Sequence, residues 1–166
     1  MKAMRKYISV VDGFNYGLGR IAMYGIFVLM GILLWSSYNK TFASPQLWTL
    51  EMAQFVMVGY YILGGPYALQ MGSNVRMDLF YAELTPRKKA WTDSITVMFL
   101  LIYLVILLWG GIESTLYSFK YGGERSPTAW RPYMWPVKVT MCIGIFLMLL
   151  QAVSELFKDI LFLKSG

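Results

Sequence analysis

Four long stretches of the chain contain no Asp, Glu, Lys or Arg. They cover residues 21–39, 52–75, 94–112 and 139–154. As α-helices that rise 1.5 Å per residue they measure about 24–36 Å, which matches a hydrocarbon core of about 30 Å. Apolar flanks complete the shorter fourth stretch. The pattern predicts one all-α integral membrane domain over residues 1–166, with four transmembrane helices at about 19–39, 49–72, 92–117 and 136–157.

The segments between these stretches carry loop signals. Breakers stand between the predicted helices, namely Ser44-Pro45, Thr85-Pro86, Gly122-Gly123 and Ser126-Pro127. Within the second helix, Gly64-Gly65-Pro66 predicts a kink. We therefore expect short connections and no separate extramembrane domain.

Composition agrees with a membrane protein and removes several chemistries. Hydrophobic residues make up 57% and charged residues 14% of the 166 residues, whereas about a quarter of a soluble domain is charged. There is no histidine and one cysteine, Cys142. This excludes histidine-ligated zinc or haem, a histidine general base and an intrachain disulfide. We expect neither an enzyme nor a cofactor. The net charge of +6 is better explained by basic membrane loops than by nucleic acid.

The distribution of Lys and Arg predicts the orientation. Ten lie in the N-terminal segment, the second loop and the C-terminal segment, and five lie in the other two loops. Cytoplasmic segments carry the excess of such residues, so both termini are predicted to be cytoplasmic.

The N-terminal segment predicts an amphipathic helix in the cytoplasmic interface rather than a cleavable signal. Apolar residues recur at helical spacing over residues 4–18, and Lys2, Arg5 and Lys6 lie nearby. These apolar residues are Met4, Tyr7, Ile8, Val11, Phe14 and Leu18. Asp12-Gly13 is expected to interrupt this helix.

Polar and small residues form a stripe on three of the predicted helices. The stripes include Glu51, Gln54 and Gly65; Gly110 and Glu113; and Gly144, Gln151 and Glu155. Lipid does not favour such faces, so each is predicted to pack against another helix. The sequence leaves open whether that helix belongs to this chain or to a larger partner.

No charged residue falls at the centre of a predicted crossing. Glu51 and Glu113 lie near the outer ends of their helices, where a charge is tolerated at the interface more often than it relays a proton or ion. Outside the membrane, Arg125 and Arg131 flank Trp130. They could bind carboxylates of a soluble partner or form a solvated loop, and the sequence does not decide between the two.

Two segments resemble a known family of membrane proteins. The first is Leu47-Trp48-Thr49-Leu50-Glu51 followed by residues 72–81, and the second is residues 123–132 running into Met134-Trp135-Pro136-Val137-Lys138. Their order, with four crossings, is similar to the small membrane subunit, or Q component, of tripartite ATP-independent periplasmic (TRAP) transporters. Asn74 stands where many members have histidine, which removes any role of that imidazole here.

The resemblance implies a non-catalytic subunit in the bacterial inner membrane. In this family a periplasmic binding protein captures an organic anion, commonly a carboxylate, and a large membrane subunit moves it with a sodium gradient. The small subunit packs on the static scaffold of the large one. Docking candidates for the binding protein are Lys120, Arg125 and Arg131. Subunit-interface candidates are Glu51, Gln54, Gly65, Arg76, Asp78, Glu113, Gly144 and Gln151.

The sequence also permits an alternative class of protein. A self-sufficient small transporter could work as a homo-oligomer, with Glu51 or Glu113 as the carboxylate that couples transport to protons or ions. An integral membrane enzyme is disfavoured because clusters of His and Cys are absent from the sequence and the loops are short.

Overall fold

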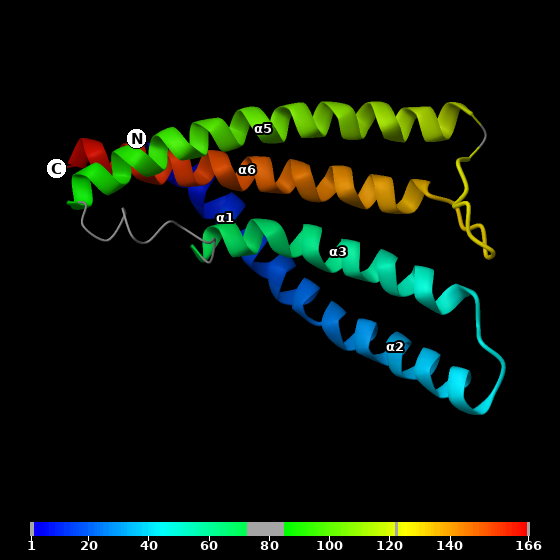
Figure 1. The fold of residues 1–166 in the computed structure, drawn as a ribbon. Coiled ribbons are helices and arrows are strands. Elements are labelled where there is room, and N and C mark those ends of the chain that lie inside the picture. Colours follow the sequence, from blue (N-terminus) through cyan, green and yellow to red (C-terminus); the bar gives the residue numbers. More distant parts are fainter. Residues whose placement is uncertain (1, 73–84, 122, 166) are drawn as a thin grey trace.

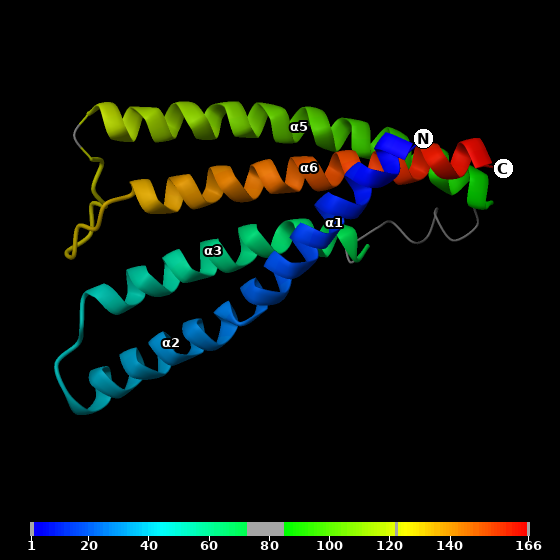
Figure 2. The same ribbon diagram turned by 180° about the vertical axis from the view of Figure 1, so that it is seen from behind.

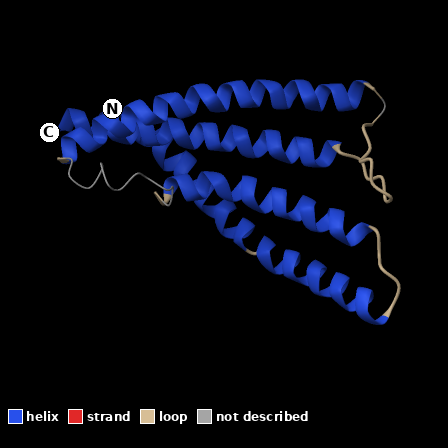
Figure 3. Ribbon diagram, viewed as in Figure 1, coloured by secondary structure: helices blue, strands red, loops and turns tan. Residues whose placement is uncertain are grey.

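The computed structural model describes residues 2–72, 85–121 and 123–165. These residues form five α-helices and, in the described ranges, no strand. They are α1 (Lys2–Met23), α2 (Gly25–Phe42), α3 (Trp48–Gln70), α5 (Pro86–Lys120) and α6 (Trp135–Ser165). Figure 3 shows how little of the described chain lies outside helices.

The long helices lie side by side in a row. Figures 1 and 2 show the order α2, α3, α6, α5 from two opposite sides. Helix α6 packs against α5 and α3, α3 packs against α2, and α1 crosses α3 and α6. Both termini lie at one end of the row, here called the terminal end. The segments 43–47 and 123–134 lie at the opposite end, here called the loop end.

A row of helices buries little of its own surface. The buried apolar core centres on Leu104, Ile145 and Ala152, where α5 meets α6. Many large apolar side chains on α2 and α5 remain exposed, such as Phe27, Leu34, Phe99 and Trp109. In water such faces would aggregate, whereas lipid or another membrane protein can cover them. The protein is an all-α integral membrane protein, as predicted.

Three helical segments among the described residues are long and apolar enough to cross a membrane. They are Met4–Phe42, which takes in most of α1 and all of α2, then Arg87–Lys120 and Trp135–Lys164. Helix α3 has 23 residues but also contains Glu51, Gln54, three tyrosines and Pro66, which lower its hydropathy. Its length, about 34 Å at 1.5 Å per residue, still suits a crossing beside α2. The fourth crossing therefore remains a prediction that rests on this placement.

The N-terminal helix differs from its prediction in two ways. Helix α1 runs without interruption through Asp12-Gly13. The break lies instead at Tyr24, which separates α1 from α2. Two backbone hydrogen bonds there span three residues instead of four, from Tyr24 N–H to Ile21 O and from Phe27 N–H to Tyr24 O. The predicted first crossing, 19–39, consequently spans the end of α1 and most of α2.

Most of the apolar stripe of α1 packs against the protein, and the position of this helix in the cytoplasmic interface stays a prediction. Val11 is buried, and the Tyr7 ring makes an edge contact with Phe157 of α6 at 5.5 Å between centroids. At Gly19 a Cβ atom would overlap the Tyr67 side chain, so glycine allows α1 to cross α3 closely. Only Phe14 of the predicted stripe is largely exposed.

Candidate functional site

Polar side chains gather between α1 and α6 near the terminal end. This group, called here the α1–α6 cluster, consists of Asp12, Asn15, Gln151, Ser154, Glu155 and Lys158. The α6 members follow one another at spacings of three, one and three residues, which places them on one helix face. The cluster therefore joins two segments that are about 140 residues apart in the sequence.

Gln151 occupies the centre of the α1–α6 cluster and is fully buried. Its Oε1 accepts a hydrogen bond from Asn15 Nδ2 at 2.7 Å. Its Nε2 donates to Asp12 Oδ1 at 2.9 Å and to Glu155 Oε1 at 3.0 Å. All three bonds stay inside the chain, so Gln151 has no surface to offer a partner. The expected contact of this residue with another subunit stays a prediction.

Lys158 closes the cluster by pairing with two carboxylates. Its Nζ lies 2.6 Å from Asp12 Oδ2 and 2.8 Å from Glu155 Oε1. Ser154 Oγ donates to Asp12 Oδ1 at 2.8 Å, so both oxygens of Asp12 are bound. Carboxylates held in this way are not free to bind a substrate or ion. The arrangement instead clamps α1 on α6 in one register, a role that buried polar groups serve in some proteins.

Helices α3 and α6 approach most closely at Gly144. A Cβ atom there would overlap Ile62 Cγ2 and lie 3.1 Å from the Ile62 carbonyl oxygen. Pro66 lies four residues after Ile62 and has no N–H to donate to that carbonyl. Gly65 meets the end of the Met148 side chain in the same interface. Gly65 and Gly144, both subunit-interface candidates, thus pack within the chain.

The remaining interface candidates are split between buried and exposed positions. Glu51 is buried near the loop end of α3, and its Oε2 has no hydrogen-bond partner. Gln54 on α3 and Glu113 on α5 are exposed and available to a partner. Arg76 and Asp78 lie outside the described residues. The polar stripe of α6 therefore makes its hydrogen bonds within the chain. The polar stripes of α3 and α5 still have exposed members that could contact a partner.

An ion pair orders the loop end between α5 and α6. Lys138 Nζ pairs with Glu124 Oε2, which also accepts a hydrogen bond from Ser118 Oγ at 2.8 Å. The hydrogen bond from Lys138, followed by that from Ser118, lowers the pKa of Glu124 below its usual value. The ion pair and its bond from Ser118 were not singled out from the sequence, because the three residues lie on α5, the loop and α6.

The segment 124–134 folds back on itself as a small hairpin. Ser126 N–H donates to Pro132 O at 3.0 Å and Met134 N–H to Glu124 O at 3.0 Å, on either side of an antiparallel bridge between Arg125 and Tyr133. At Gly123, with φ of +86°, a side chain would meet the Tyr133 ring. The hairpin therefore needs glycine where it leaves α5.

The three docking candidates are exposed at this hairpin or beside it. Arg125 lies against Tyr133, with its Cζ 4.7 Å from the ring centroid and an Nη atom 2.7 Å from the phenol oxygen. Arg131 has a positive φ of 49° in the turn. Lys120 ends α5, with its Nζ 6.0 Å from the Tyr121 ring centroid. The hairpin thus brings two arginines and the half-exposed Trp130 to one short loop.

Across the described ranges, no group of three His, Cys, Asp or Glu side chains is placed to hold a metal ion. An apolar groove does run over Gly110 and Gly111 of α5 beside Met141 of α6. Its walls are almost entirely apolar, as expected for a surface that lipid or a transmembrane helix covers.

Comparison with known proteins identifies the family. No curated protein matches the chain. The model of the family described as "Tripartite ATP-independent periplasmic transporters, DctQ component" matches residues 29–162, which include α3, α5 and most of α2 and α6. Because this match covers well over half of the sequence, the chain belongs to the DctQ component family of tripartite ATP-independent periplasmic transporters.

Proposed function

We propose that this chain is the small permease subunit of a TRAP transporter and that it packs on the scaffold of the large membrane subunit. Its task is to support sodium-driven uptake of an organic anion, a carboxylate, that a periplasmic binding protein delivers. The family match over residues 29–162 carries the proposal. In this arrangement the chain lies in a bacterial inner membrane with both termini in the cytoplasm.

The exposed faces of the helix row support a partner within the membrane. Helices α2 and α5 stand at the two edges of the row and expose large apolar side chains along their length. Gln54 and Glu113 add polar groups to exposed faces of α3 and α5. Because polar groups facing lipid are unfavourable, a partner helix that bonds to them would be stabilised there. These residues are our candidates for contacts with the large subunit.

Docking of the binding protein is assigned to the loop-end hairpin. Arg125, Arg131 and Lys120 present three cations next to Trp130, and arginine and tryptophan are common anchors at protein interfaces. The contact between Arg125 and Tyr133 restrains the guanidinium before any partner arrives. Restraint of this kind reduces the entropy lost on binding.

Copurification and uptake test the proposed function. The chain should copurify in detergent with its large subunit, and reconstituted alone in liposomes it should transport no organic anion. Uptake by the chain alone would contradict the proposal and favour a self-sufficient homo-oligomer. In that event Glu51→Gln and Glu113→Gln would identify the coupling carboxylate.

Charge reversal tests the docking surface. The double variant Arg125→Glu/Arg131→Glu should lower uptake by the complete transporter at low salt about tenfold or more, because like charges then face the carboxylates of the binding protein. Copurification with the large subunit should be unchanged, since both residues lie in the loop. Unaltered uptake at low salt would show that these arginines take no part in docking.

A further inference from the structure

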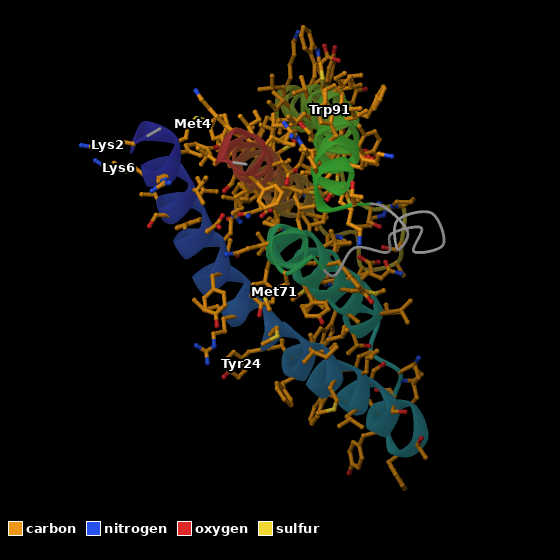
Figure 4. All side chains as sticks on the ribbon, turned by 90° about the vertical axis from the view of Figure 1, so that its left-hand side faces the viewer. Lys2, Met4, Lys6, Tyr24, Met71 and Trp91 are labelled. Carbon is orange, nitrogen blue, oxygen red and sulfur yellow. The ribbon has the colours of Figure 1, made fainter. Side chains whose placement is uncertain are left out.

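Helix α1 exposes a basic face at the terminal end of the molecule. Lys2, Arg5 and Lys6 are all exposed, and Figure 4 shows Lys2 and Lys6 projecting away from the neighbouring helices. Arg87 and Lys88 are also exposed in the first turn of α5, which begins at the same end of the row. Five exposed cations therefore lie at the terminal end of the helix row.

The α1–α6 cluster determines which side of α1 faces outward. Asp12 and Asn15 bind α6 through Gln151 and Lys158. Because a helix turns about 100° per residue, the side opposite these contacts carries Lys2, Lys6 and Val10 in successive turns. The rotation of α1 is thus set by bonds inside the protein, and it holds Lys2 and Lys6 on the outer side. Arg5 is exposed at the edge of that side, on the flank that carries Asp12 two turns later.

The same outer side changes from basic to apolar along the helix. Val10 is 63% and Phe14 60% exposed, one to three turns after the three cations. This sequence of charges followed by apolar side chains suits the boundary between lipid headgroups and acyl chains. A soluble acidic partner would leave Val10 and Phe14 uncovered, whereas a phospholipid has both an anionic headgroup and an apolar chain.

The acidic residues that the structure describes in this region are paired or partly buried. Asp12 and Glu155 are paired with Lys158 inside the α1–α6 cluster. Asp93 and Asp159 are partly buried. The exposed charge on α1 is therefore positive, and its complement is an anionic surface.

We propose that the outer side of α1 binds anionic phospholipid, with Lys2 and Lys6 on the headgroup phosphate, Arg5 as a further cation at the edge of that side, and Val10 and Phe14 along the acyl chain. Each Lys or Arg near an anionic lipid surface strengthens binding about fivefold. Loss of all three cations would thus weaken binding on the order of 100-fold at most, and salt screening reduces this figure. A loss of about tenfold or more is expected.

Lipid titration of the whole purified chain tests this proposal. In a neutral detergent, native mass spectrometry would count phosphatidylglycerol and phosphatidylcholine bound at equal concentrations. The wild type should retain phosphatidylglycerol in preference. The variant Lys2→Gln/Arg5→Gln/Lys6→Gln should lose phosphatidylglycerol affinity about tenfold or more, with little change for phosphatidylcholine.

A matched variant separates this site from general charge effects. Lys40→Gln/Lys120→Gln/Arg131→Gln removes the same number of charges at the loop end and should retain wild-type lipid preference. The proposal is wrong if both triple variants bind phosphatidylglycerol equally well, or if the wild type shows no preference. Because all six side chains are exposed, circular dichroism and the melting temperature should stay unchanged in both variants.

Discussion

Replacing Gln151 distinguishes a role inside the chain from a role at a subunit interface. In Gln151→Met the side chain keeps a similar length, but its three hydrogen bonds to Asn15, Asp12 and Glu155 are lost. The Asn15 amide is itself buried, so its Nδ2 would have no acceptor. The perturbation therefore removes the centre of the α1–α6 cluster and leaves the packing of α6 nearly intact.

The expected cost follows from the number of bonds. Hydrogen bonds between helices of membrane proteins contribute about 0.6 kcal/mol each on average, so three contribute roughly 2 kcal/mol. For a protein of this length, each kcal/mol shifts the melting temperature by about 2–4 °C. Thermal unfolding of the purified chain alone, in detergent, should thus show a melting temperature about 4–8 °C lower in Gln151→Met than in the wild type.

Gln54→Met is the matched control because Gln54 is exposed on α3. It makes the same chemical change and should leave the melting temperature of the isolated chain within about 1 °C of the wild type. If Gln151→Met shifted the melting temperature no more than this control but weakened copurification with the large subunit, the role assigned to Gln151 inside the chain would be refuted.

Three further changes probe other contacts of the isolated chain. Lys158→Met leaves two carboxylates without their cation and should lower the free energy of unfolding by about 1–3 kcal/mol. This range is discounted for solvent screening because the lysine side chain is 33% exposed. The control Lys164→Met, at an exposed position in the last turn of α6, should leave the free energy of unfolding unchanged. Gly144→Leu should destabilise the chain by about 1–3 kcal/mol or more, because the new side chain would overlap α3. The control Gly110→Leu should not destabilise it, because that position faces open space. Equal effects of the two variants would contradict the close contact between α3 and α6. Because a hydrogen bond from its lysine partner lowers the pKa of Glu124, the stabilisation by this pair is present above the usual carboxyl pKa and is lost as the pH falls through the lowered pKa. The difference in melting temperature between the wild type and Glu124→Gln should therefore close at acidic pH, and a difference that does not depend on pH would exclude an ionic origin.

The α1 segment shows that a correct local pattern does not say what covers each residue of a helix. Spacing predicted a helix over residues 4–18, and α1 covers that range. The apolar stripe was assigned to the membrane interface, yet Tyr7 and Val11 pack within the protein. A helical period shows which residues share a face but not what covers that face. Asp12-Gly13 was expected to interrupt the helix. The sequence could not show that Asp12 is bound there, because its partners lie on α6, about 140 residues away.

The stripe on α6 illustrates the same limit for the candidate site. Gly144 and Gln151 were correctly grouped on one face, but the sequence left open whether that face meets this chain or a partner. Gly144 contacts Ile62 and Gln151 contacts Asn15, both in the same chain. Polar groups on one transmembrane helix can bond only to the helix that lies beside it. Which helix that is depends on the packing of the whole row.

By itself the sequence determined the environment, the helical class, the approximate helices and, through the order of two segments, the family. The environment and the helices follow from hydropathy and helix length, which can be read from each segment alone. A lipid core excludes backbone groups without hydrogen bonds and disfavours charged side chains at its centre. Only the tertiary structure decided the order α2, α3, α6, α5, the break at Tyr24 and the clamp between α1 and α6. The helix order and the clamp depend on contacts between residues far apart in the sequence, where one glycine or one buried amide selects the neighbour.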